Sequence, residues 1–239
     1  MSDSAGQVQS SVTPVELCCE YAVDPLGIDV PEPRFSWVLA SSRRGQVQSA
    51  YRILVASSEE GLGGGIGDKW DSGVVASDES VNVAYAGAAL SSGERCFWKV
   101  QVWDGRGCVS AWSATATFEM GLLDPSDWNG TWISAEADLA APLLRKEFSL
   151  EQAVAKARLY LSGLGLYELS INGARVGDRV LDPALTDYRV RVPYVTPRRQ
   201  PAPAARPQRG RRDARQTAGT AGCPGSASDL PKTCNSCCS

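Results

Sequence analysis

The sequence of 239 residues contains no histidine. Because histidine is the usual general base and the commonest transition-metal ligand, its absence excludes Ser-His and Cys-His nucleophilic catalysis. Long apolar runs are also missing, since no stretch reaches the roughly 18 apolar residues that a membrane-spanning helix needs. The first residues, MSDSAGQVQSS, lack the basic start and apolar centre of a secretory signal. These absences predict a cytoplasmic protein with no membrane partner.

The eight cysteines do not follow the pattern of a disulfide framework. Two are adjacent and two lie in strand-like segments: Cys18, Cys19, Cys96 and Cys108. In a protein without a signal we expect these four to be reduced. The other four lie near the C-terminus: Cys223, Cys234, Cys237 and Cys238. They offer one Cys-x-x-Cys pair, whereas a zinc site usually has two pairs in a foldable frame, so we predict no metal and no cofactor.

Charge is distributed unevenly along the chain. Residues 189–239 contain ten of the 24 Lys and Arg residues and two of the 27 Asp and Glu residues, a net charge of +8. Because the whole chain carries −3, residues 1–188 carry −11. The C-terminal stretch has no Ile or Phe, and no aromatic residue after Tyr194. It cannot bury enough apolar surface to offset its conformational entropy, so we expect residues 197–239 to be disordered.

A basic arm of this kind could also bind nucleic acid or another anionic partner. Arg206–Arg215 (RPQRGRRDAR) would hold phosphates weakly and in a salt-dependent way. No aromatic residue is interleaved to stack on bases, so we predict no nucleic-acid partner.

Residues 14–120 alternate polar and apolar side chains as in an antiparallel β domain. The clearest strands are Arg34–Leu39, Ala50–Ala56, Cys96–Trp103 and Thr115–Glu119. In the third of these, Trp98, Val100 and Val102 lie on the side expected to be buried, opposite Lys99. Ser58–Lys69 is Gly-rich and polar, which predicts a loop. Strands at this spacing over about 100 residues favour an immunoglobulin- or fibronectin III-like sandwich.

A connector over residues 121–141 leads to a second β unit, residues 142–196. Its expected strands are Leu144–Leu150, Ala157–Leu161, Leu166–Ile171, Arg175–Gly177 and Val192–Thr196. Asn172-Gly173 predicts a type I′ turn. A jelly-roll-like sandwich needs about eight strands, so this one is expected to be incomplete. The fold class is therefore all-β: a closed sandwich, an incomplete sandwich and a disordered tail.

The carboxylates nearest to a catalytic arrangement are Asp124, Asp127, Asp178, Asp182 and Asp187. Acid–base catalysis needs two carboxyl groups across a rigid cleft, whereas Asp is also favoured in turns and at helix starts. We interpret these residues as turn and cap residues, so no catalytic residue is assigned. Gly61–Gly67 lacks the Lys-Ser/Thr of a phosphate-binding loop, and we interpret it as a flexible turn.

Four tryptophans could stack on sugar rings: Trp70, Trp98, Trp103 and Trp112. In a small sandwich, Trp more often packs in the core, and that is the interpretation we adopt. The substrate-binding residues therefore stay unassigned.

Several long stretches resemble bacterial α-L-rhamnosidases of glycoside hydrolase family 78. They are Leu17–Trp37, Gln48–Ser57, Trp70-Asp71-Ser72-Gly73, Phe97–Trp112, Phe118–Trp132, Pro142–Phe148 and Arg158–Tyr188. The resemblance implies an immunoglobulin-like domain followed by the rhamnosidase N-terminal β-sandwich. In the family a later (α/α)₆ barrel carries the carboxylates for inverting hydrolysis of terminal α-L-rhamnosyl residues, and no part of this chain resembles that barrel.

The resemblance predicts a non-catalytic N-terminal portion of an enzyme whose substrate is a rhamnose-containing glycoside. The alternative is a carbohydrate- or protein-binding module without catalysis. In some relatives this sandwich binds rhamnose with the help of Ca²⁺, for which Asn172, Asp178 and Asp182 would supply oxygens. Asn172 fits the predicted turn better, so no metal site is assigned.

The loss of pattern beyond Arg189–Pro197 generates a prediction about the encoding DNA. A shifted reading frame in GC-rich DNA would produce the Arg, Pro, Ala and Gly found there. We expect that translating the other frames from codon 180 onward restores a periodic β pattern and then a helical barrel. If no frame continues in this way, the shift did not occur and the tail is a genuine arm.

Overall fold

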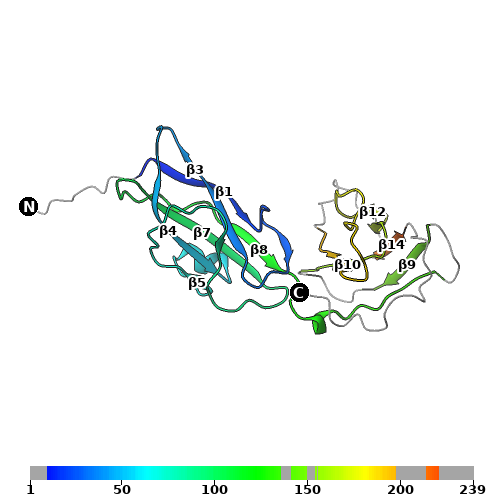
Figure 1. The fold of residues 1–239 in the computed structure, drawn as a ribbon. Helices are drawn as coiled ribbons and strands as arrows, with labels where there is room; N and C mark the ends of the chain where they lie inside the picture. Colours follow the sequence, from blue (N-terminus) through cyan, green and yellow to red (C-terminus); the bar gives the residue numbers. More distant parts are fainter. Residues whose placement is uncertain (1–9, 136–140, 150–153, 155, 198–213, 221–239) are drawn as a thin grey trace, which may run out of the picture. The chain divides into compact units, whose positions relative to one another are not determined.

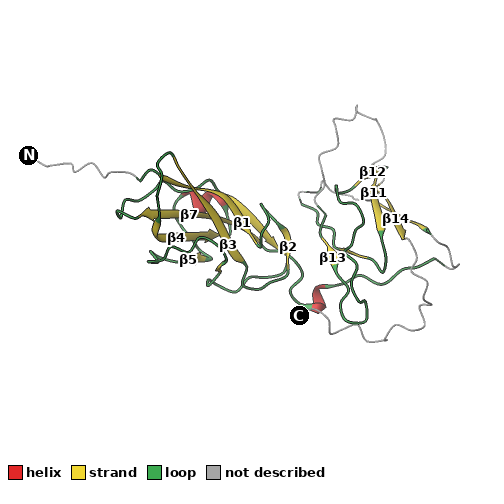
Figure 2. Cartoon of the chain, turned by 45° about the horizontal axis from the view of Figure 1, so that its top comes forward, coloured by secondary structure: helices red, strands yellow, loops and turns green. Residues whose placement is uncertain are grey.

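The structure is a computed structural model that describes residues 10–135, 141–149, 154, 156–197 and 214–220. The chain divides into two compact units, Met1–Leu123 and Asp124–Ser239. Among the described residues of both units, strands and connecting segments predominate (Figure 1; Figure 2). The prediction of an all-β class is confirmed.

The first unit is a sandwich of two sheets (Figure 1). The five-stranded sheet has the order β2 (Leu26–Ile28), β8 (Ala116–Met120), β7 (Arg95–Asp104), β4 (Gln48–Ala56) and β5 (Trp70–Asp71). The three-stranded sheet has the order β1 (Val12–Cys19), β3 (Arg34–Ser41) and β6 (Val83–Ala84). All pairs are antiparallel except β2 with β8. The immunoglobulin-like sandwich expected from the sequence is therefore present.

The core of this unit is a cluster of aromatic rings contributed by both sheets. Phe35 of β3 lies against Trp98 of β7, with ring centroids 4.4 Å apart. Phe118 of β8 meets Phe35 edge-on at 5.6 Å. Trp98, Val100 and Val102 are all fully buried, which confirms the face predicted from the alternation. Burial of these aromatic and branched side chains is the main source of stability for a sandwich of this size.

One segment of the first unit differs from its prediction. The range Ser58–Lys69, expected to be a loop, contains the short helix α1 (Glu59–Gly63). The Ser58 hydroxyl accepts a hydrogen bond from the Gly61 amide at 3.1 Å, so Ser58 is the N-cap. Leu62 is fully buried and anchors the helix on the sheet. The cap and one apolar contact outweigh the low helix propensity of the glycines.

The second unit contains short strands in two sheets. One has the order β12 (Ala174–Arg175), β11 (Tyr167–Ile171), β14 (Ala214–Thr220) and β9 (Leu143–Phe148). The other pairs β10 (Leu161–Ser162) with β13 (Tyr194–Val195), and a single 3₁₀ turn, η1 (Pro125–Asp127), opens the unit. Asn172 and Gly173 have φ values of 54° and 79° and join β11 to β12, which confirms the type I′ turn.

Several expected boundaries in the second unit are wrong. Ala157–Leu161 was expected to be a strand, but only Leu161 belongs to one, β10. Arg175–Gly177 contributes only Arg175 to β12, and Val192–Thr196 is reduced to Tyr194–Val195. Strand limits depend on where a partner strand begins and ends, which alternation within one segment does not specify.

Part of the expected tail is structured. Ala214–Thr220 forms β14 and pairs with both β11 and β9, so the prediction of disorder does not hold for these seven residues. Backbone hydrogen bonds to two neighbouring strands do not require apolar side chains. Residues 198–213 and 221–239, with the four C-terminal cysteines and most of Arg206–Arg215, lie outside the described residues.

The two units differ sharply in core content. Prolines aside, every buried apolar side chain in the described part of the chain lies in the first unit, with Leu169 as the exception. The first unit therefore carries its own hydrophobic core, as an independently stable domain must.

Replacing Phe35 by Ala tests this account of the core. The change leaves a cavity between the sheets, so we expect the free energy of unfolding to fall by about 3–5 kcal/mol. Denaturant unfolding followed by tryptophan fluorescence measures it. Val74→Ala, at an exposed position, serves as the control and should change stability by less than about 0.5 kcal/mol. A small loss for Phe35→Ala would show that the ring is not central to the core.

Candidate functional site

The outer face of the five-stranded sheet gathers charged and aromatic side chains and is the candidate site. Tyr51, Ile53 and Val55 of β4 point into the core, so Arg52, Leu54 and Ala56 point to the other face. The antiparallel register places Arg52 opposite Gln101, Leu54 opposite Lys99 and Ala56 opposite Phe97. Strand β5 adds Asp71 beside Leu54.

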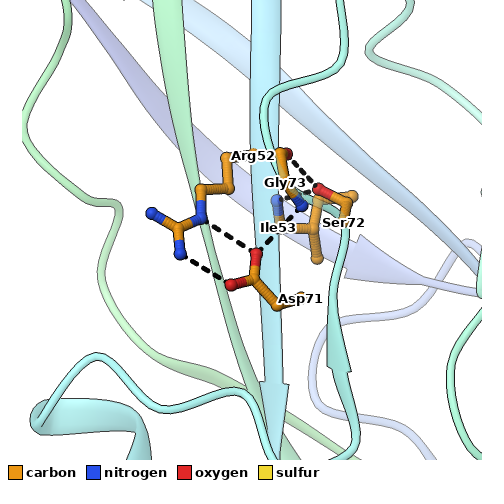
Figure 3. Close-up of polar contacts among 5 residues, drawn as sticks. All are labelled: Arg52, Ile53, Asp71, Ser72 and Gly73. Carbon is orange, nitrogen blue, oxygen red and sulfur yellow. Dashed lines mark hydrogen bonds and ion pairs between the residues drawn. The ribbon is translucent and has the colours of Figure 1, made fainter.

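Arg52 and Asp71 form a two-point ion pair on this face (Figure 3). Arg52 Nε donates to Asp71 Oδ1 at 2.9 Å, and Nη2 donates to Oδ2 at 2.6 Å. The Gly73 amide donates to Asp71 Oδ1 at 2.9 Å. These bonds, chiefly those from Arg52, hold the pKa of Asp71 below its usual range. The carboxylate stays ionised at neutral pH and is not suited to act as a general acid.

The residues after Asp71 complete the same local network (Figure 3). The Ser72 hydroxyl accepts from the Ile53 amide at 2.8 Å and donates to the Gly73 carbonyl at 2.8 Å. Gly73 has a φ of 62°, a conformation that favours glycine. Trp70 packs on the core, 5.4 Å from the Tyr85 ring. The Trp70-Asp71-Ser72-Gly73 motif thus builds and ends β5, and each residue has a structural role.

Lys99 lies on the outer face as predicted, but it is buried, with 8% of its surface exposed. Its Nζ donates to the Leu62 carbonyl in α1 at 2.5 Å and lies 4.8 Å from the centre of the Trp112 ring. The ammonium is therefore held by a carbonyl oxygen and a cation–π contact. Burial lowers the pKa of Lys99. Lys99 fastens α1 to the sheet, so Gly61–Gly67 is not simply the flexible turn that the sequence suggested.

Two of the five candidate aspartates, Asp124 and Asp187, have turn or cap contacts, and Asp182 has an ion pair. Asp124 is the N-cap of η1, where its Oδ1 accepts from the Ser126 amide at 2.8 Å. Asp187 accepts two hydrogen bonds from the Arg189 side chain, at 3.1 and 3.0 Å. Asp182 lies 3.9 Å from Arg179, and its carbonyl accepts from the Tyr167 amide. These contacts agree with the turn-and-cap interpretation.

The other candidate residues are dispersed. Asp127 lies in η1, Asp178 is exposed, and Asn172 forms the β11–β12 turn. No group of three or more His, Cys, Asp or Glu residues that could hold a metal ion occurs within the described ranges.

The tryptophans follow the packing interpretation. Trp98 is in the core, Trp70 packs against it, and Trp112 lies beside Lys99 on the outer face. Trp103 is partly buried.

Sequence reasoning missed Arg52 and Lys99, because their partners are 19 and 37 residues away and no local spacing marks them.

Cys18, Cys19, Cys96 and Cys108 are free thiols. Burial raises the pKa of Cys96 to about 12 and raises that of Cys19 as well. These two thiols are therefore protonated and poorly nucleophilic at neutral pH.

Across the part of the chain that the structure describes, no helix has the length and apolar character needed to cross a bilayer.

Two family models match the chain. Residues 14–124 match the Rha78A-like, N-terminal immunoglobulin domain. Residues 152–197 match the alpha-L-rhamnosidase N-terminal domain. The first match coincides closely with the first compact unit, and the second falls within the second unit.

Individual relatives agree with these matches. An alpha-L-rhamnosidase of Formosa agariphila is 38% identical over 72% of this chain and 21% of its own length. One of Streptomyces avermitilis is 41% identical over 66% of this chain and 18% of its own length. The solved alpha-L-rhamnosidase from Dictyoglumus thermophilum superposes with a TM-score of 0.76 at 38% identity, over 87% of this chain and 24% of that one. The chain spans about a fifth of the length of the curated relatives it matches.

Replacing Asp71 by Asn tests the ion pair. The folded-state pKa of Asp71 is lowered, so its stabilising effect is present above the unfolded pKa of about 3.9 and is lost as the pH falls through the folded value. The pair is partly exposed, so we expect Asp71→Asn to cost up to about 1 kcal/mol at pH 7 and almost nothing at the lowest pH. Urea unfolding across pH measures this. The control Asp78→Asn removes an exposed charge, and an equal pH-dependent loss there would contradict the assignment.

Proposed function

Since residues 14–124 and 152–197 match two N-terminal domain families of α-L-rhamnosidases, we propose that this chain serves as the non-catalytic N-terminal β module of an enzyme that hydrolyses α-L-rhamnosides. The observation that carries the proposal is the pair of domain matches in this order, 14–124 and 152–197. The proposed substrate of the intact enzyme is a glycoside with a terminal rhamnosyl residue.

The chemistry of the described carboxylates supports a non-catalytic role. Inverting hydrolysis needs one protonated carboxyl group and one carboxylate about 6.5–9.5 Å apart, with a water between them. Asp71 and Asp187 are each bound by an arginine that lowers the carboxyl pKa. The pKa of Asp124 is lowered in the same direction by its cap bonds to Ser126. None of these three carboxyl groups is suited to hold the proton that a leaving glycosidic oxygen must receive.

A second candidate function is rhamnose binding without hydrolysis. One relative, the α-L-rhamnosidase of Streptomyces avermitilis, was solved as a complex with L-rhamnose, at 30% identity and a TM-score of 0.50. That complex favours rhamnose as the sugar to test on this chain.

The two candidates predict different outcomes with the purified chain. We expect no release of nitrophenol from an aryl α-L-rhamnoside above the buffer rate, because the bonds to Asp71, Asp124 and Asp187, among the carboxyl groups of the described residues, favour the ionised form. An active α-L-rhamnosidase assayed in parallel is the control. Turnover above buffer would contradict the non-catalytic role. Calorimetric titration with L-rhamnose, with and without Ca²⁺, distinguishes the candidates, since measurable saturable binding would favour the sugar-binding module.

A further inference from the structure

We propose that the segment Val180–Val190 of the second unit is a docking surface for the part of an α-L-rhamnosidase polypeptide that lies outside the region matched by this chain. The inference rests on the proposed function. This inference goes beyond the proposed function because it names a surface and the partner that binds there.

The segment exposes large apolar side chains in a unit that buries few. Val180, Leu181, Leu185 and Val190 are 69–75% exposed. Leu169 is the one buried large apolar side chain in the described part of this unit. Apolar surface left in water is unfavourable, at roughly 25 cal/mol per Å², and these four exposed side chains lie within eleven consecutive residues.

Polar contacts and one buried proline hold the backbone of the segment in place. The Asp182 carbonyl accepts from the Tyr167 amide of β11 at 2.9 Å, and Pro183 beside it is buried. The Tyr188 hydroxyl accepts from the Gly165 amide at 3.0 Å. The Thr186 hydroxyl donates to the Arg191 carbonyl at 2.6 Å. The anchors are thus polar groups and one proline, while the leucines and valines are left outside.

The backbone at Leu181 is set in an unusual conformation. Its φ is 62°, in the left-handed region that costs a bulky residue roughly 1–2 kcal/mol. Strain of this kind persists where the surrounding contacts fix it, and it occurs often at binding surfaces. Here the Arg179–Asp182 pair and the Asp182–Tyr167 bond flank the residue. The result is a leucine held outward rather than folded against its own unit.

The lengths of the relatives point to the proposed partner. Relatives are roughly four to six times as long as the matched region, which covers 18–24% of their length. The segment lies inside residues 152–197, the match to the rhamnosidase N-terminal domain. In those relatives, the same domain is therefore joined to a much longer polypeptide, which can cover these side chains.

Binding between two separately produced polypeptides tests the proposal. The probe is the Dictyoglumus thermophilum α-L-rhamnosidase without the region that this chain matches. Calorimetry and light scattering after gel filtration measure its association with the full chain. We expect a one-to-one complex, weakened about tenfold or more by Leu181→Asn and by Leu185→Asn. Asn tolerates the left-handed region, so Leu181→Asn should fold normally, as circular dichroism can check.

The control is Val74→Asn, which replaces a 61% exposed valine in the first unit and should bind as the wild type does. No complex, or a complex unaffected by both leucine variants, would overturn the proposal. A homodimer of this chain that is lost in Leu181→Asn would also overturn it, because the partner would then be a second copy. These results concern association alone. The proposed function fails separately, if the isolated chain hydrolyses the aryl rhamnoside.

A measurement on this chain alone covers the case in which the probe polypeptide does not fold. We expect the apolar dye bis-ANS to bind the full chain, and both leucine variants to bind several-fold less than Val74→Asn. Equal dye binding by the leucine variants and the control would show that the segment does not present an apolar surface.

Discussion

The first unit depends on the contact between Phe35 and Trp98, where the inner faces of the two sheets meet. Because side chains on a strand alternate between faces, the strands that supply this core must place their remaining side chains on the outside. On β4 and β7 those outward positions hold Arg52, Lys99 and Phe97. The outer face is mixed, since Leu54 and Ala56 are buried there with Leu62 of α1, next to the charged side chains. Its contacts with Asp71, Leu62 and Trp112 then fasten β5 and α1 to the sheet.

Features set by neighbours in the sequence could be predicted, and features set by distant partners could not. The buried face of β7 and the Asn172-Gly173 turn follow from a few adjacent residues, and both were predicted correctly. The turn and cap roles of Asp124 and Asp187 were also readable, since Asp favours such positions. The bonds of Arg52 and Lys99 depend on the register between β4, β5 and β7, which alternation leaves open. The helix α1 was not predicted, because the glycines of Ser58–Lys69 favoured a loop.

The residues that make the family recognisable are those that hold the fold. Trp70 packs on the core, Asp71 binds Arg52, Ser72 satisfies the Ile53 amide and Gly73 turns the chain. Resemblance in such a motif therefore reports on the fold first, and a function must be argued separately from a site.

The lengths of the edge strands have a consequence for aggregation. The five-stranded sheet ends in β2 and β5, of three and two residues, and the three-stranded sheet ends on one side in β6, of two. The longer edge strand, β1, is interrupted by a register shift between Val15 and Cys18. Short or irregular edges offer few consecutive backbone groups to a strand from another molecule, and the Arg52–Asp71 charges add a further barrier beside β5. The Arg52–Asp71 ion pair, which holds the edge strand β5 in place, thus also helps to protect the first unit against intermolecular β-sheet growth.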